Sequence, residues 1–255
     1  MKILALDSSG LVASVAVVEN DTLLAEYTVN YKKTHSQTLL PMLDEISNMT
    51  ELDLSTIDAI AVAGGPGSFT GLRIGSATAK GLGLALEKPL ISIPTTAAIA
   101  YNIWDTDKFV CPIMDARRNQ VYTGVYCYTD HRLDTVWEQD TMSIEALAEG
   151  LNCLDHEVIF LGDGVAVYRE KLEALLTIPF SFAPAHVNRQ RAAAVGALAE
   201  VYYKEGKIQT AEEHEPEYLR KSQAERERAE RESVKHADAV SYTHLRAHET
   251  VLDLV

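Results

Sequence analysis

The sequence has few cysteines, few basic side chains and no long apolar run. Its three cysteines are odd in number and form no C-x-x-C pair, so neither a disulfide framework nor a zinc ribbon is indicated. The 23 Lys and Arg residues stand against 37 Asp and Glu, a net charge of −14. Because holding nucleic-acid phosphates requires clustered cations, this balance argues against a chain that holds nucleic acid by itself. The first apolar run, residues 3–6, ends at Asp7, which is too short for a signal peptide or a membrane span. We predict a cytoplasmic protein that does not enter a membrane.

Motifs of hydrolytic and metal-dependent catalysis are also missing. The sequence contains no H-E-x-x-H and no G-x-S-x-G, and its histidines up to His214 stand singly. His244 and His248 have the spacing of paired zinc ligands on a helix, but they lie in the terminal segment and no Glu follows the first. We therefore predict no catalytic residue and no metal ligand.

The hydrophobic content, 47% of the 255 residues, is that of a folded globular chain. Turn residues and hydrophobic periodicity predict two successive units with the same order of elements: three strands, a helix, a strand and a helix. The first unit is predicted at residues 3–6, 12–18, 23–29, 35–49, 57–63 and 70–86, the second at 110–114, 121–128, 133–137, 143–151, 158–161 and 165–176. A strand at 90–93 and helices at 95–103 and 189–204 complete the predicted α/β chain.

A glycine-rich segment, residues 64–75, lies between a predicted buried strand and a helix. Glycine allows sharp turns and close approach, and a helix N-terminus attracts anions, so the segment could cradle a phosphate. Its spacing fits neither G-x-x-x-x-G-K-[ST] nor G-x-G-x-x-G, which leaves a simple strand-to-helix turn open. The candidate residues of a degenerate nucleotide loop, here and at two other strand ends, are Asp7, Ser8, Ser9, Gly65, Gly67, Ser68, Gly162 and Gly164.

Small residues recur four apart along the helix that follows, at Gly71, Gly75, Ala79 and Gly83. Glycine in an exposed helix costs about 1 kcal/mol relative to alanine, so close approach of another backbone should compensate. That backbone belongs either to the chain's own sheet or to a partner subunit.

Several motifs, in order, resemble the TsaB (YeaZ) family. They are ILALDSS at 3–9, HSQTLLPM at 35–42, GPGSFTGLRIG at 65–75, DARR at 115–118 with VY at 121–122, and PEYLR at 216–220. The resemblance covers about residues 1–223 and implies two ribonuclease-H-like lobes of the actin and sugar-kinase ATPase fold. Residues 1–104, joined by the helix near 189–204, would form the first lobe and residues 105–188 the second. A charged extension would follow at 205–232. Residues 233–255 do not resemble the family's ending, and we interpret them as a non-native or disordered tail.

The resemblance also implies a role. TsaB proteins are non-catalytic scaffold or activator subunits that pair with TsaD, the subunit that threonylcarbamoylates adenosine in tRNA, and with the ATPase TsaE. It implies a homodimer when TsaD is absent and contact with tRNA mainly through the partners. No cofactor is required, although ATP or ADP could occupy a site shared with the partner.

In this family the first two helices of the first lobe contact TsaD. The predicted partner interface is accordingly Leu39, Leu43, Ile46, Gly71, Gly75 and Ala79. On this basis Gly75→Leu should abolish association and leave the fold intact.

Two enzymatic alternatives remain open from the residues. One is a sugar-kinase-like ATPase that uses Asp7 and the loop at residues 65–68, and the other is a metalloprotease of the glycoprotease type. Both require convergent acid, base and metal-ligand residues, which the sequence does not supply.

Overall fold

The computed structural model describes residues 1–31 and 35–220. The predicted tail at 233–255, most of the charged extension, and His244 with His248 lie outside the described residues.

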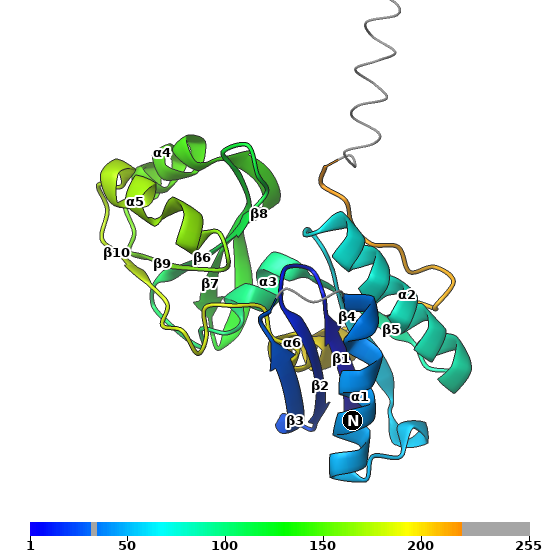
Figure 1. Cartoon of the computed structure of the whole chain (residues 1–255). Helices are drawn as coiled ribbons and strands as arrows, with labels where there is room; N and C mark the ends of the chain where they lie inside the picture. Colours follow the sequence, from blue (N-terminus) through cyan, green and yellow to red (C-terminus); the bar gives the residue numbers. More distant parts are fainter. Residues whose placement is uncertain (32–34, 221–255) are drawn as a thin grey trace, which may run out of the picture. The chain divides into compact units, whose positions relative to one another are not determined.

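The first lobe is built on a five-stranded sheet of order β3-β2-β1-β4-β5 (Figure 1). Strands β1 to β3 form an antiparallel meander, and β4 and β5 continue the sheet parallel to β1. The strands are β1 (Lys2–Asp7), β2 (Ala13–Glu19), β3 (Thr22–Val29), β4 (Ala59–Gly65) and β5 (Leu90–Pro94), and the helices α1 (Leu39–Thr50), α2 (Phe69–Leu86) and α3 (Thr95–Ala100), with 3-10 turns at His35–Gln37 and Leu54–Thr56.

The second lobe repeats this arrangement with the strand order β10-β9-β6-β7-β8. Its strands are β6 (Phe109–Asp115), β7 (Gln120–Thr129), β8 (Arg132–Ser143), β9 (Val158–Leu161) and β10 (Phe180–Phe182), and its helices α4 (Ile144–Leu154) and α5 (Val165–Leu175). The last described helix, α6 (Ala192–Lys204), packs against β1 and β2 of the first sheet. The two sheets confirm the predicted fold class.

The element boundaries differ from the sequence prediction at several places. Strand β10 was not predicted, because three half-buried residues are too few to show an alternation. Strand β8 continues to Ser143, although its second half is polar, because it is the edge strand of its sheet. The turn at His35–Gln37 is a 3-10 helix, so α1 begins only at Leu39, and α6 begins at Ala192 rather than near 189.

Three groups of buried side chains explain why β1 and β4 are continuous apolar runs. One group lies between the first sheet and α1 with α2, a second between the second sheet and α4 with α5. The third joins the two sheets through α3 and α6, and it includes Ala97, Val110 and Val195. Strands β1 and β4 are therefore covered on both faces, and for this reason nearly all of their residues are hydrophobic.

Helix α6 is fixed to the first sheet by polar contacts at its N-terminus. The half-buried Arg191 guanidinium donates from Nη2 to Glu26 Oε2 at 2.5 Å, and the backbone N–H of Ala193 donates to Glu26 Oε1 at 3.1 Å. Ser14 Oγ accepts from the N–H of Ala192 at 2.9 Å. The helix has no side-chain cap of its own, so strands β2 and β3 supply one.

We expect Glu26→Ala to lower the free energy of unfolding by roughly 2 kcal/mol, because it leaves Arg191 and the first turn of α6 without their acceptor. Urea unfolding at neutral pH measures the change. The matched control is Glu173→Ala, which removes an exposed ion pair with Arg169 at 3.9 Å and should change stability by less than about 0.5 kcal/mol. Equal effects of the two substitutions would contradict this account of α6.

Candidate functional site

The turn after β1 and the glycine-rich segment after β4 lie directly against each other. The N–H of Ser68 donates to the carbonyl of Ser9 at 2.6 Å, and Ser8 Oγ donates to the carbonyl of Gly71 at 2.8 Å. A Cβ on Gly67 would lie 2.3 Å from the Ser9 carbonyl oxygen. The structure thus brings the predicted Asp7–Ser9 and Gly65–Ser68 residues together, and only glycine permits the approach.

Three backbone N–H groups of the glycine-rich segment donate hydrogen bonds within the chain. The N–H of Gly65 donates to Thr95 Oγ1 at 3.2 Å, and that of Gly71 to Ser68 Oγ at 3.4 Å. With Ser68 N–H bonded to Ser9, three donors of the segment point to groups of the chain itself. These three N–H groups are therefore held by internal hydrogen bonds.

Asp7 is fully buried beneath this contact. Its Oδ1 accepts hydrogen bonds from the N–H and the hydroxyl of Ser9, at 2.9 and 2.7 Å, whereas Oδ2 has no hydrogen-bond partner in the described structure. Burial raises the pKa of Asp7 to about 6, although the bonds from Ser9 oppose this. Close by, the buried Gln190 fills the space beside Gly10, and neither atom of its amide has a partner among the described residues.

The second lobe repeats the strand-to-glycine contact without a cradle. A Cβ on Gly162 would lie 2.2 Å from the carbonyl oxygen of Ile113, and the N–H of Gly164 donates to the same oxygen at 3.0 Å. Burial raises the pKa of Asp163, between these glycines, and its charge contributes to the raised pKa of Asp7. The predicted Gly162 and Gly164 therefore serve the close packing of α5 against β6.

The six predicted interface residues all lie buried inside the first lobe, and their contact with a partner stays a prediction. Leu39, Leu43 and Ile46 face the sheet and are at most 5% exposed, and Gly71, Gly75 and Ala79 are buried on the inner face of α2. A Cβ on Gly71 would lie 2.0 Å from the carbonyl oxygen of Ser8. The small-residue stripe thus admits the chain's own β1 turn.

Sequence reasoning missed an aromatic stack on the outer side of α2. The rings of Phe69 and Tyr218 lie 4.6 Å apart between centroids, and the guanidinium of Arg73 lies 4.3 Å over the Phe69 ring. The spacing of Phe69 and Arg73, four residues apart, is the available signal, because such residues share a helix face. The contribution of Tyr218 requires the tertiary structure.

Tyr218 belongs to a segment, residues 209–219, that runs along α2 and that we call the strap (Figure 1). Gln209 pairs with Leu90 through two backbone hydrogen bonds, and Lys80 Nζ of α2 donates to the carbonyl of His214 at 2.9 Å. At the far end, the N–H of Glu217 donates to the carbonyl of Gly64 at 2.7 Å. The strap is therefore attached to β5, α2 and the end of β4.

Glu217 also joins the two lobes. Gln139 Nε2 on β8 donates to Glu217 Oε2 at 2.7 Å, and Gln139 Oε1 accepts from Thr96 Oγ1 at 2.8 Å. Thr96 in turn shares a hydrogen bond of 2.7 Å with the hydroxyl of Tyr126 on β7. The chain of contacts from the glycine segment to the second sheet fixes the strap against both lobes.

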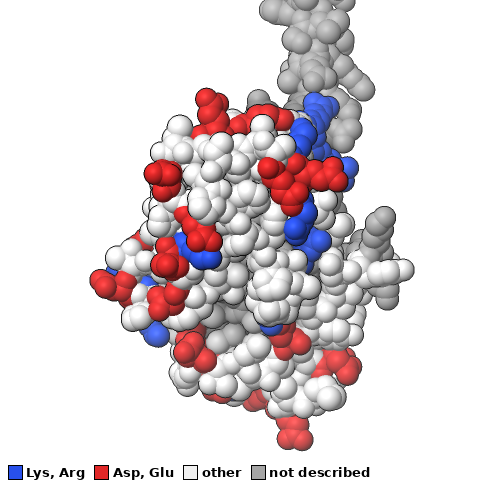
Figure 2. Space-filling model, turned by 90° about the vertical axis from the view of Figure 1, so that its left-hand side faces the viewer, with Lys and Arg blue, Asp and Glu red and all other residues white. Residues whose placement is uncertain are grey.

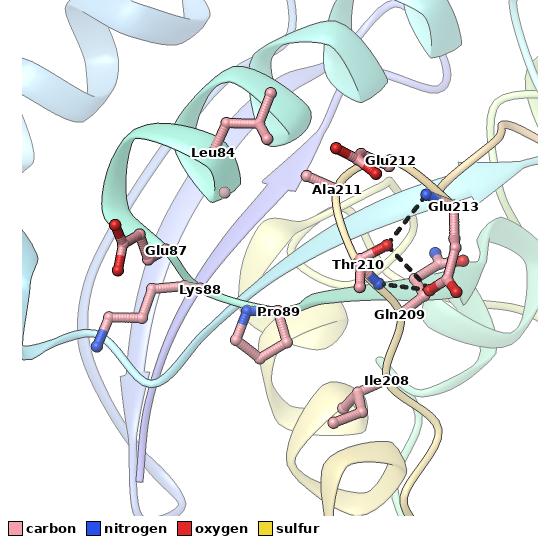
Figure 3. A pocket seen from close by; sticks show the side chains of 11 residues that line it. Leu84, Glu87, Lys88, Pro89, Ile208, Gln209, Thr210, Ala211, Glu212 and Glu213 are labelled. Atoms are coloured by element: carbon pink, nitrogen blue, oxygen red, sulfur yellow. Dashed lines mark hydrogen bonds between the residues drawn. The ribbon is translucent and has the colours of Figure 1, made fainter.

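A pocket of about 560 Å³ lies where the strap passes the C-terminal end of α2 (Figure 3). Its walls include Leu84 and Pro89 on one side and Ile208 and Ala211 on the other. Thr210 and Glu213 hold the strap's turn there, since the N–H and hydroxyl of Thr210 both donate to Glu213 Oε2. The pocket lies away from Asp7 and carries no set of catalytic groups.

Residues 1–31 and 35–220 contain neither a group of metal-ligating side chains nor a helix able to span a membrane. No three His, Cys, Asp or Glu side chains there are grouped as metal ligands. No helix there has the length and hydrophobicity needed to cross a bilayer. Asp and Glu side chains occur at many places on the face seen in Figure 2.

Comparisons with known proteins show the family of this chain. The model of the family described as TsaD, tRNA N6-adenosine threonylcarbamoyltransferase, matches residues 22–228. The tRNA threonylcarbamoyladenosine biosynthesis protein TsaB of Bacillus subtilis is 32% identical over 88% of this chain and 96% of its own length. The TsaB of Escherichia coli is 30% identical over 88% and 96%. This chain belongs to the TsaB family.

Solved structures of TsaB-type proteins share the fold. YeaZ from Pseudomonas aeruginosa superposes with a TM-score of 0.74 at 28% identity, covering 86% of this chain and 99% of that one. Component A of (R)-2-hydroxyglutaryl-CoA dehydratase from Acidaminococcus fermentans gives a TM-score of 0.50 at 12% identity, over 81% and 100%. That second likeness shows the two-lobed fold alone.

The TsaB glycine segment gives a matched pair of substitutions within α2. Gly71→Ala should lower the free energy of unfolding by about 2 kcal/mol, because its Cβ would overlap the Ser8 carbonyl. Gly81→Ala should raise it by about 0.5–1 kcal/mol, because a Cβ there meets nothing within 4 Å. Denaturant unfolding of both variants tests this, and stabilisation by Gly71→Ala would refute the close contact.

Gly75→Leu belongs to the same group. Its Cβ would lie 2.5 Å from Ser8 Oγ, so its effect falls on the fold first, contrary to the sequence prediction.

The raised pKa of Asp7 predicts a pH-dependent effect of Asp7→Asn. The folded chain binds the Asp7 proton more tightly than the unfolded chain, so this site contributes stability at low pH that is lost as the pH rises through about 6. Asp7→Asn should therefore be more stable than the wild type at pH 8, by about 2–3 kcal/mol, and the difference should shrink towards pH 4. Urea unfolding across this range measures it. A difference that does not vary with pH would show that burial leaves the Asp7 pKa unshifted.

Proposed function

We propose that this chain is a non-catalytic accessory subunit in the synthesis of threonylcarbamoyladenosine in tRNA, and that it acts by pairing with a TsaD protein. One observation carries the proposal: a TsaB chain keeps the two-lobed ATPase fold while its glycine segment is closed by its own β1 turn. Three backbone N–H groups of that segment donate within the chain, which supports the proposal. Nucleotide and acyl-transfer chemistry then fall to a partner.

The net charge of the chain supports contact with tRNA mainly through the partner proteins. A net charge of −14 repels a polyanion, and several cations of the described surface are already paired, among them Lys108 with Glu157 and Lys171 with Glu145. We therefore assign most tRNA phosphate contacts to TsaD and to the TsaE ATPase that joins the pair. The complex would work in the cytoplasm.

The proposed role also includes the cofactor need and the oligomeric state of the chain. The chain needs no cofactor of its own, and ATP or ADP would bind, where it binds, at a site shared with the partner. In the absence of TsaD, two copies would pair through the first lobe. The contact would use outward side chains of α1 and α2, since the inward ones are occupied.

The sugar-kinase and metalloprotease alternatives have no supporting geometry. A kinase needs open phosphate donors beside Asp7, whereas three donors of the segment are bonded within the chain. A metalloprotease needs a ligand cluster, and the described residues hold none.

Reconstitution tests the proposed function. TsaD and TsaE are supplied with tRNA, ATP and the threonylcarbamoyl donor, with and without this chain, and modified adenosine is measured by mass spectrometry. We expect modification to depend on the chain and to survive Asp7→Asn within about twofold, because Asp7 has no part in the chemistry. ATP turnover by the chain alone that Asp7→Asn abolishes would overturn the proposal in favour of the kinase.

A further inference from the structure

The turn between β6 and β7, which carries the DARR motif, has a backbone that its sequence does not favour. Arg117, Arg118 and Asn119 have φ angles of 62°, 55° and 60°, so three successive residues with a Cβ lie in the left-handed region. In that region the Cβ of an L-residue lies too close to the following carbonyl oxygen, and asparagine, aspartate and histidine tolerate this better than other side chains. Asn119 is of this kind, but the two arginines are not.

Two other hairpins of the same chain show the usual choice of residues. The β2–β3 turn has Asn20 and Asp21 at positive φ, and the β7–β8 turn has Asp130 and His131. All four belong to the residue types that favour this conformation. The β6–β7 turn departs from that choice, and a role for the arginine side chains themselves explains the departure.

Side chains on both sides of the β6–β7 turn hold it in place. Asp115 Oδ1 accepts from the N–H of Arg117 at 2.8 Å. Asn119 Nδ2 donates to the two oxygens of the Glu145 carboxylate at 3.0 and 2.7 Å, and Asn119 Oδ1 accepts from Lys171 Nζ. Because Glu145 lies on α4 and Lys171 on α5, both of these helices fix the turn.

The two arginine side chains are left unpaired by this arrangement. Both are exposed, and within residues 1–31 and 35–220 neither guanidinium has an ion-pair partner or a hydrogen-bond acceptor. The carboxylates beside them are engaged elsewhere, since Asp115 accepts from the backbone and Glu145 from Asn119 and Lys171. A fixed turn thus presents two cations to an anion from outside the chain.

The chemistry of that anion follows from the number of donors. Each planar guanidinium binds two acceptor oxygens in bidentate geometry. A single carboxylate has two oxygens, which is enough for one arginine, whereas an RNA backbone presents non-bridging phosphate oxygens at every nucleotide. Successive phosphates therefore engage both arginines at once.

The exposure of the turn favours RNA over a free nucleotide. Sites for molecules of nucleotide size enclose most of their ligand. Because Arg117, Arg118 and Asn119 are all exposed, a nucleotide held by its phosphates would leave its base and ribose in water. A phosphate on the surface of a large RNA needs no such enclosure.

From the disfavoured backbone, the contacts that fix it and the two unpaired cations, we infer that the β6–β7 turn is this chain's own contact with tRNA, and that Arg117 and Arg118 bind phosphates of the RNA backbone. The inference rests on the proposed function and deepens it. It agrees with the net charge of −14, because two cations add a local contact to an RNA that the partner subunits hold. Such a contact positions the tRNA without reading its sequence.

Binding of tRNA to the assembled complex of this chain with TsaD and TsaE, measured by filter binding over a series of salt concentrations, tests the inference. The double variant Arg117→Asn with Arg118→Asn removes both guanidinium groups and introduces residues that favour positive φ. We expect the dissociation constant for tRNA to rise at least tenfold, and the slope of log K against log salt to fall by about 1–2, the share of two phosphate contacts. The free energy of unfolding should stay equal or rise, which a purely structural role of the arginines would not allow.

Two further variants complete the design. Replacement of both arginines by lysine keeps the charge without the bidentate geometry and should give an intermediate loss of tRNA affinity. The control, Arg132→Asn, removes an exposed arginine beside the other end of β7, and it should leave the affinity within twofold and the salt slope unchanged. Thermal melting and co-elution with TsaD show that each variant is folded and assembled.

The outcomes separate this inference from the proposed function. Wild-type tRNA affinity and salt slope in the double asparagine variant would overturn the phosphate contact and leave the accessory role intact. Loss of TsaD or TsaE from the complex in that variant would overturn it in favour of a protein contact, and weaker ATP binding with unchanged tRNA affinity would overturn it in favour of a nucleotide site. Modification that proceeds equally well without this chain would overturn the proposed function and this inference with it.

Discussion

The contact between the β1 turn and the glycine segment after β4 determines how α2 packs on the first sheet and how deeply Asp7 is buried. Two hydrogen bonds, from Ser68 N–H to Ser9 and from Ser8 Oγ to Gly71, bring two backbones closer than any side chain would allow. This approach places α2 on the sheet, covers the buried Asp7, and bonds the Ser68 N–H within the chain. The close packing of the two segments therefore stabilises the first lobe.

The strap extends this contact to the rest of the chain. It bonds to Gly64 at the end of β4, to α2 through Lys80, and to the second lobe through the pair Glu217 and Gln139. Thr96 donates to Gln139 and shares a hydrogen bond with the Tyr126 hydroxyl on β7, so the position of α2 is coupled to the second sheet. A subunit that acts by presenting a surface gains from such coupling, since a preorganised interface loses less entropy on association.

Much of the fold could be predicted from the sequence because its elements carry strong local signals. The run at 57–63 is apolar throughout, and the glycines after it mark the strand end, so β4 and α2 follow directly. The short β10 and the polar half of β8 gave no such signal, because their pairing depends on neighbours in the sheet. For the site, the sequence placed Asp7 and Gly65 in the same candidate nucleotide loop. It could not show that Ser9 and Thr95 accept hydrogen bonds from the backbone N–H groups of the glycine-rich segment.

The stripe of small residues on α2 has a physical cause that applies to amphipathic helices in general. Such a stripe marks the face where a helix approaches something closely, but the pattern does not say whether that neighbour is the chain's own sheet or another subunit. In α2 the neighbour of this face is the β1 turn. On the outer side of the helix, Phe69 packs against Tyr218, which comes from a distant segment of the chain. A contact between residues so far apart in the sequence has no period, so it could be found only once the strap was placed beside the helix.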